Sequence, residues 1–259
     1  MRKYCLLIVS ALLLCAAMQV SAQKEVAFDS PKLKLFLPEA GATGRAVLIL
    51  PGGGYAGLAS DNEGYGWVDY FTGKGIAAAV LEYTLPEGNR SLPFDDVEKA
   101  MKLLRSHAEE WHIDTAQIGI MGSSAGGHLA STYATHCKPE LAPAFQILFY
   151  PVITMDVSYT HRGSRDHLLG TDVSPELEKE YSNEKQVTEK TSRAIILIAD
   201  GDDIVPVENG VNYYLALKKH NVPASLYIYP GGGHGFGSRP DFIYREEMLM
   251  NLTSWLKSF

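Results

Sequence analysis

A short motif around Ser124 has the residue types and spacing of an activated serine nucleophile. The letters G-S-S-A-G at 122–126 fit the pattern G-x-S-x-G, and they stand where an apolar run at 117–121 gives way to a helical pattern. In a sharp strand-to-helix turn, small flanking residues let neighbouring backbone approach closely while the serine hydroxyl projects outward. Ser123 falls out of this frame, because Met121 would occupy a required glycine position. The sequence therefore predicts Ser124 as a nucleophile; the alternative is a Gly/Ser-rich turn that only caps a helix.

His234 has the position expected of the base that would activate such a serine. A serine hydroxyl is a weak nucleophile until a base takes its proton and an acid orients that base. Where the nucleophile sits on a strand-to-helix turn, the base comes late in the chain, after the acid. His234 follows an apolar run at 224–229 and is surrounded by glycines. The other histidines lie on or beside helical patterns, or, as with His161 and His167, in an irregular stretch where nothing positions them.

Three aspartates crowd the loop that would supply the acid. Asp200, Asp202 and Asp203 follow an apolar run at 194–199. We favour Asp202 as the carboxylate that orients His234, since it forms a D-x-x-V-P frame with the residues after it. Asp203 is the reserve candidate, and Asp200 is expected to have a supporting role. A calcium loop is the competing interpretation, but the alternating oxygen ligands and terminal acidic residue of an EF-hand are missing, so no metal site is predicted.

A glycine-rich loop early in the chain has the composition of an oxyanion-binding loop. The letters P-G-G-G-Y at 51–55 follow an apolar run at 46–50. Acyl transfer develops negative charge on the carbonyl oxygen, and losing one backbone donor aimed at that oxygen costs about a hundredfold in rate. The predicted donors are backbone N–H groups of this loop together with the N–H of Ala125, the residue after the nucleophile. A phosphate-binding loop is disfavoured, because the Lys-Ser/Thr pair of a P-loop and the spacing of a dinucleotide fingerprint are absent.

Apolar runs and helical patterns alternate along the chain, and they must position these loops. Six short runs bounded by Gly or Pro are typical of buried strands, at 46–50, 76–81, 117–121, 144–150, 194–199 and 224–229. Helical patterns fall at 66–71, 94–111, 125–135, 207–220 and 242–256. The alternation predicts an α/β fold, a mainly parallel sheet with helices on both faces and a site at the carboxyl ends of the strands. Residues 152–192 break the rhythm and are interpreted as a small cap over that site.

The first 22 residues have the pattern of a secretory signal peptide. Two basic residues precede an apolar run that ends near Ala17, and Val20-Ser21-Ala22 suits a cleavage site. Residues 23–259 are therefore predicted to form one exported catalytic domain, periplasmic or secreted. No later apolar stretch reaches the roughly 18 residues that a membrane-spanning helix needs.

The composition excludes several classes of protein. A hydrophobic share of 46% with 20% charged residues is that of an ordered globular domain rather than a disordered or fibrous chain. The net charge is −7, and no Lys/Arg-rich run stands out. A nucleic acid is therefore not an expected partner.

These motifs resemble the α/β-hydrolase superfamily, in particular a bacterial carbohydrate-esterase branch related to feruloyl and acetyl xylan esterases. The resemblance rests on P-G-G-G-Y at 51–55, G-S-S-A-G-G-H-L-A at 122–130, Y-S-N at 181–183, Asp202 with Val205-Pro206, and G-H-G-F at 233–236. It implies Ser124 as nucleophile, His234 as base and Asp202 as its orienter, without a metal or organic cofactor. It also implies the N–H groups of Gly53, Gly54 and Ala125 as the oxyanion donors. One departure is Pro51, which stands where lipase-like relatives carry histidine.

The resemblance also implies a substrate, an acylated carbohydrate. It favours an esterase that removes acetyl, or less readily feruloyl, groups from xylan-type fragments through an acyl-enzyme. Four aromatic side chains in or near the predicted loops are candidates to stack on sugar rings, namely Tyr55, Tyr65, Trp67 and Phe236. The alternatives are a small serine peptidase of the prolyl-oligopeptidase type and a non-catalytic carbohydrate-binding homologue. The second is disfavoured because a strained nucleophile turn persists only where function needs it.

Overall fold

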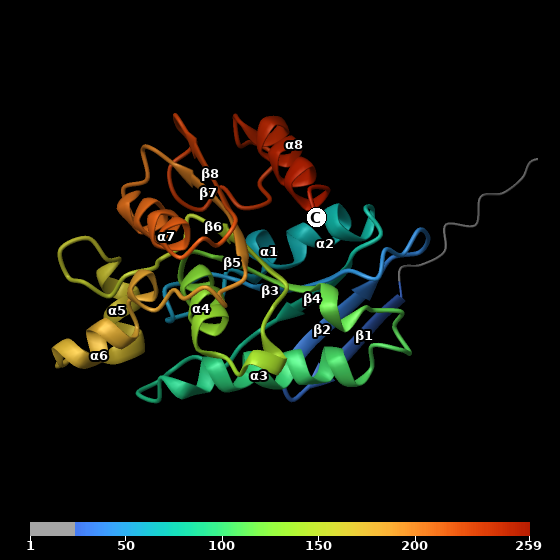
Figure 1. Cartoon of the computed structure of the whole chain (residues 1–259), viewed down its shortest axis with the longest axis horizontal. Helices are drawn as coiled ribbons and strands as arrows, with labels where there is room; N and C mark the ends of the chain where they lie inside the picture. Colours follow the sequence, from blue (N-terminus) through green and yellow to red (C-terminus); the bar gives the residue numbers. More distant parts are fainter. Residues whose placement is uncertain (1–23) are drawn as a thin grey trace, which may run out of the picture.

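One eight-stranded sheet organises the protein, which a computed structural model describes over residues 24–259 (Figure 1). The predicted signal peptide, residues 1–22, lies outside the described residues and stays a prediction. The sheet order is β1-β2-β4-β3-β5-β6-β7-β8. The strands are β1 (Lys24–Asp29), β2 (Lys32–Leu37), β3 (Ala46–Leu50), β4 (Ala77–Leu81), β5 (Ile118–Ser123), β6 (Phe145–Phe149), β7 (Arg193–Ala199) and β8 (Ala224–Tyr229).

The six predicted strands form the parallel part of this sheet. The strands β4, β3, β5, β6, β7 and β8 pair side by side in the same direction. Every residue of β3, β4, β5 and β6 is buried. This agrees with the prediction from their continuous apolar runs, which are typical of strands covered on both faces. The predicted α/β-hydrolase fold is thus confirmed in its sheet, and the loops after these strands gather at one edge.

The antiparallel hairpin β1–β2 was not predicted. It pairs with β4 through β2 and extends the sheet at one side. In β2, Leu33 and Leu35 are buried while Lys32 and Lys34 are exposed, so apolar and polar residues alternate. A search for continuous apolar runs misses such a strand, because a strand with one solvated face shows a period of two.

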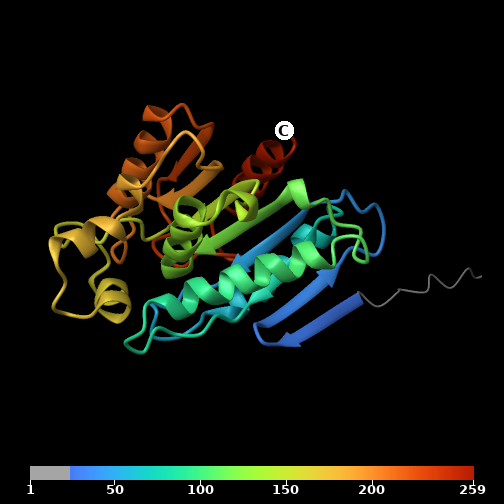
Figure 2. The same ribbon diagram turned by 60° about the horizontal axis from the view of Figure 1, so that its bottom comes forward.

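Helices cover both faces of the sheet (Figures 1 and 2). One buried cluster includes residues of α3, α4 and α7, and the cluster on the opposite face includes residues of α2 and α8. Among residues 24–259, no helix has both the length and the apolar composition that crossing a membrane requires. The helices are α1 (Ser60–Glu63), α2 (Val68–Thr72), α3 (Ser91–Ser106), α4 (Ser124–His136), α5 (Arg162–Leu169), α6 (Pro175–Glu180), α7 (Glu208–Lys219) and α8 (Arg245–Leu256).

The segment between β6 and β7, predicted as a cap, carries the two short helices α5 and α6. It projects at one end of the molecule, in yellow in Figures 1 and 2. The buried Arg165 stabilises this segment. Its Nε donates to the Met155 carbonyl at 3.0 Å, and its Nη2 donates to Glu178 Oε2 at 3.3 Å. The cap is therefore an ordered unit with its own internal contacts.

Candidate active site

Ser124 sits on a strained turn between β5 and α4. It is the first residue of α4, and its φ of +52° lies in the left-handed region that residues other than glycine rarely adopt. A Cβ atom on Gly122 would collide with the Gly126 carbonyl, and one on Gly126 would collide with the Leu50 carbonyl. Both glycines of the G-x-S-x-G motif are therefore required by the crowded backbone on either side of Ser124.

A chain of hydrogen bonds joins Ser124, His234 and Asp202. His234 Nε2 lies 2.9 Å from Ser124 Oγ, and His234 Nδ1 lies 2.7 Å from Asp202 Oδ2. An ionised carboxylate only accepts hydrogen bonds, so Nδ1 carries the proton and Nε2 is left to accept from the serine hydroxyl. This is the arrangement in which an imidazole can take the serine proton.

The loop after β7 presents Asp202 to His234. The other carboxylate oxygen, Oδ1, accepts the backbone N–H groups of Ile204 and Val205 at 3.0 and 2.9 Å, and the side chain is only 2% exposed. The D-x-x-V-P frame thus supplies the donors that orient the carboxylate. Asp200 and Asp203 are exposed, and the structure brings neither of them into this chain of hydrogen bonds.

The glycine loop after β3 lies directly against Ser124. A Cβ on Gly52 would come within 2.8 Å of Ser124 Cβ, and Gly53 and Gly54 have φ values of +127° and +66°. Among residues 24–259, the N–H groups of Gly53 and Gly54 donate to no acceptor. Ala125 is the second residue of α4, so its N–H is also free of a helical partner. Three N–H groups are therefore available on the two segments that meet at Ser124.

Two histidines of the cap, which the sequence could not position, reach this glycine loop. His167 Nδ1 lies 2.9 Å from the Gly54 carbonyl and donates to it. A Cβ on Gly54 would lie 3.7 Å from His161 Cε1. His161 Nδ1 accepts the N–H of Ser164, which leaves its hydrogen on Nε2, and burial lowers the pKa of this histidine. Helix α5 and the residue before it thus lie against the glycine loop.

The expectation that Tyr55, Trp67 and Phe236 contact substrate is wrong, because all three side chains are buried. Their exposed fractions are 2%, 1% and 2%. Trp67 packs on Phe149 with ring centroids 4.7 Å apart, and Phe236 stacks on Phe242 at 4.3 Å. These rings fill the core beneath the loops, where aromatic residues are commonly found.

Tyr65 is partly exposed but lies in a different hollow. Its hydroxyl donates to Glu82 at 2.8 Å, and its ring meets Phe36 of β2 edge-on. The hollow is lined by residues of the β1–β2 hairpin, by Tyr65 and by the start of α2, and it contains none of the residues that surround Ser124. The hydrogen bond to Glu82 and the contact with Phe36 turn Tyr65 toward the β1–β2 hairpin, and its stacking on a sugar ring stays a prediction.

His128 connects the glycine loop to the cap from within the core. It is fully buried; its Nε2 donates to the Tyr181 carbonyl at 2.8 Å, and its Nδ1 accepts the Tyr55 hydroxyl at 2.9 Å. Burial lowers the pKa of His128 to about 4, although the bond to Tyr181 opposes this shift. The histidine is therefore neutral at physiological pH and packs inside the core from α4.

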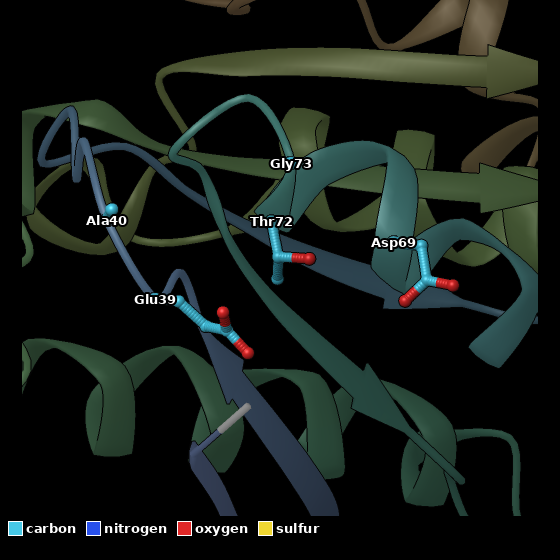
Figure 3. Close-up of a pocket in the computed structure, with 5 residues that line it drawn as sticks. All are labelled: Glu39, Ala40, Asp69, Thr72 and Gly73. Carbon is cyan, nitrogen blue, oxygen red and sulfur yellow. The ribbon is translucent and has the colours of Figure 1, made fainter. Parts of the chain in front are cut away.

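A second hollow, shown in Figure 3, lies between the loop before β3 and α2. The carboxylates of Glu39 and Asp69 and the hydroxyl of Thr72 lie around it, together with Ala40 and Gly73. None of these residues takes part in the contacts of Ser124. In the part of the chain that the structure describes, no three His, Cys, Asp or Glu side chains are grouped to hold a metal ion.

Residues 47–238 match a protein-family model described as an alpha/beta hydrolase fold. The chain belongs to the α/β-hydrolase family. The match covers the span from β3 to the loop that carries His234, so it includes Ser124 and Asp202 as well.

Three relatives of this α/β hydrolase are informative. The acetylxylan esterase of Xylanibacter ruminicola is 42% identical over 257 residues, covering 95% of this chain and 53% of the relative. The endo-1,4-beta-xylanase B of Butyrivibrio fibrisolvens is 34% identical over 220 residues, covering 79% of this chain and 34% of the relative. The crystal structure of an acetyl ester-xyloside bifunctional hydrolase from Caldicellulosiruptor lactoaceticus superposes with a TM-score of 0.83 at 33% identity, covering 88% of each chain. The chain thus spans about half the length of the first relative and about a third of the second.

Acid should destabilise this α/β hydrolase through His128. Above its ordinary pKa of 6.5 the residue is neutral in both the folded and the unfolded chain. Between pH 6.5 and about 4 the unfolded chain binds a proton that the folded chain does not, so the free energy of unfolding falls as the pH falls. The expected loss from this residue is roughly 2 kcal/mol at pH 5.

Urea unfolding at neutral pH and near pH 5 would measure this loss. His128→Gln should lower stability at neutral pH but flatten the pH dependence. His136→Gln, at the exposed end of the same helix, should keep the wild-type dependence. An unchanged slope in His128→Gln would contradict the assignment.

Proposed function

We propose that this α/β hydrolase is a serine esterase that removes acetyl groups from xylan-type polysaccharide fragments. The observation that carries the proposal is the hydrogen-bonded chain from Ser124 through His234 to Asp202, set against a glycine loop with free N–H groups. The substrate class is supported by the relatives, since two of the three are named for acetyl-ester hydrolysis and all three for xylan or xylosides.

In the first half of the proposed reaction, Ser124 Oγ attacks the carbonyl carbon of the acetyl ester while its proton passes to His234 Nε2. The Nδ1–H of the resulting imidazolium points at Asp202, which stabilises the new positive charge. The N–H groups of Gly53, Gly54 and Ala125 are the proposed donors to the tetrahedral oxyanion. Collapse of this intermediate breaks the bond to the sugar oxygen, which leaves with the proton from His234.

In the second half, water hydrolyses the acetyl-enzyme. His234 Nε2 takes a proton from the water as its oxygen attacks the acetyl carbonyl, and the same donors hold the second oxyanion. The Ser124 oxygen then leaves and recovers the proton from His234. Acetate is released and the starting hydrogen bonds are restored, so the cycle consumes one water and needs no cofactor.

Ser124→Ala is expected to lower kcat for acetate release by about 10³-fold or more, because no other group can form the acyl-enzyme. Ser123→Ala removes the same hydroxyl one residue earlier and serves as the matched control, with near wild-type turnover expected. Acetate release should be measured from acetylated xylo-oligosaccharides and from a small acetyl ester. Activity that survives in Ser124→Ala would mean that the nucleophile is misassigned.

The same assay decides among substrate classes. Turnover of the small ester alone would keep the serine-esterase mechanism and point to other acylated glycans. Faster release of ferulate than of acetate would favour the feruloyl alternative. Cleavage of an aminoacyl anilide without ester turnover would favour a peptidase.

Asp202→Asn is expected to lower kcat by about 10³- to 10⁴-fold while leaving KM nearly unchanged. An amide can donate to Nδ1, so it favours the tautomer in which His234 Nε2 carries the hydrogen and cannot accept from Ser124. Asp203→Asn alters the exposed neighbouring carboxylate and should keep wild-type kcat. Equal losses in the two variants would argue against Asp202 as the orienting acid.

Export of the enzyme is the last part of this proposal, and it is supported by the signal-peptide pattern of residues 1–22. Expression of the full chain in a bacterial host should yield an exported protein that begins at Gln23. Intact mass of the periplasmic fraction and of the medium would identify that terminus. An unprocessed chain confined to the cytosol would refute export.

A further inference from the structure

A buried carboxylate lies beneath the Ser124 site. Glu63 ends helix α1, and only 4% of its surface is exposed. Its Oε2 accepts the Gly52 N–H at 2.7 Å, and its Oε1 accepts the Tyr150 O–H at 2.8 Å. Acidic side chains are almost never buried unless both oxygens find such partners. The Gly52 N–H can only donate, and with the Tyr150 O–H donating as well the two oxygens accept as those of an ionised carboxylate do.

The first partner, Gly52, begins the glycine loop that carries the proposed oxyanion donors. A Cβ on this residue would collide with Glu63 Oε2 and approach Ser124 Cβ to 2.8 Å. The backbone of Gly52 therefore lies between Glu63 and Ser124 and is in close contact with both. Any shift of Glu63 moves the start of the loop whose next two residues are Gly53 and Gly54.

The second partner, Tyr150, packs its ring against the imidazole of His234. It follows β6 with a φ of +34°, and its ring is buried. The ring centroid lies 4.8 Å from that of His234, in an edge-on arrangement. The hydrogen bond from the Tyr150 hydroxyl to Glu63 fixes the orientation of this ring. The carboxylate therefore helps to position the side chain that packs against His234, the proposed base.

Glu63 also acts on His234 through its charge. Burial raises the pKa of Glu63 above its usual value, and the bonds from Tyr150 and Gly52 and the charge of His234 oppose this shift only in part. The attraction is reciprocal, so a negative Glu63 favours the imidazolium of His234. The other groups that face His234 are Asp202 at Nδ1, Ser124 at Nε2, Tyr150 against the ring and His161 from the cap.

We propose that Glu63 is a positioning residue for the esterase reaction. Its carboxylate holds Gly52 and Tyr150 together, which aligns the oxyanion donors with His234, and its charge stabilises the imidazolium formed when Ser124 attacks. Glu63 itself touches neither the substrate nor the reacting atoms. The inference rests on the proposed function, because it concerns the same site.

Two variants separate the two effects. Glu63→Gln keeps the shape but removes the charge, and its new amide donor must either face the Gly52 N–H or reverse the hydrogen bond with the Tyr150 hydroxyl. It should lower kcat for a small acetyl ester about 10- to 100-fold with little change in KM. It should also move the acidic limb of the pH profile to lower pH by about half a unit or more, because His234 loses a stabilising anion. Tyr150→Phe keeps the charge, so it should lower kcat less and leave that limb in place.

The labelling rate of Ser124 by a fluorophosphonate should be measured over the same pH range, since it reports the serine, the base and the oxyanion donors without needing an ester substrate. Asp61→Asn, an exposed carboxylate on the same helix, is the matched control and should behave as wild type. Circular dichroism and urea unfolding would establish that each variant is folded.

The outcomes are distinct. Wild-type labelling and turnover in Glu63→Gln, with an unshifted pH limb, would overturn the inference and leave the proposed function standing. A loss of kcat in Glu63→Gln without any shift of the limb would overturn the electrostatic part. A wild type that is neither labelled nor able to hydrolyse any acyl ester would overturn the proposed function, and the role of Glu63 with it.

Discussion

The close approach of backbone segments around Ser124 is the constraint on which the rest of the site depends. Gly122 and Gly126 leave no room for a side chain on either side of the turn, and Gly52 lies against Ser124 from the neighbouring strand end. The Val152 N–H donates to the Ser124 carbonyl at 3.0 Å, so the segment that follows β6 is also bonded to this turn. Strained backbone such as that of Ser124 persists where the surroundings over-determine it.

Strain recurs along this edge of the sheet in the residues that flank Ser124 in space. Tyr55 and Tyr150 also have positive φ values, +59° and +34°. Each has a buried side chain whose hydroxyl is hydrogen-bonded, Tyr55 to His128 and Tyr150 to Glu63. The buried aromatic rings are therefore structural supports of the loops.

The cap is tied to the same scaffold by buried amides. Asn183 Nδ2 donates to Ser131 Oγ at 2.8 Å in α4, and Asn209 Oδ1 in α7 accepts the N–H groups of Ile153 and Thr154. These bonds anchor the two ends of the cap segment, while His167 bonds to the Gly54 carbonyl near its middle. The helix that lies against the glycine loop is thus placed by contacts with the helices that cover one face of the sheet.

Most of the sheet and the loops that carry Ser124, Asp202 and His234 could be predicted from the sequence, because the period of a strand, the spacing of glycines and the order of motifs can be read along the chain. They determined the parallel sheet, the turn at Ser124, and the loops that hold Asp202 and His234. Only the tertiary structure decided which aromatic rings are buried, how His161 and His167 meet Gly54, and that Glu63 bonds to both Gly52 and Tyr150. Those facts depend on contacts between residues up to 113 positions apart, and no period or motif along the chain records which distant side chains share a buried space.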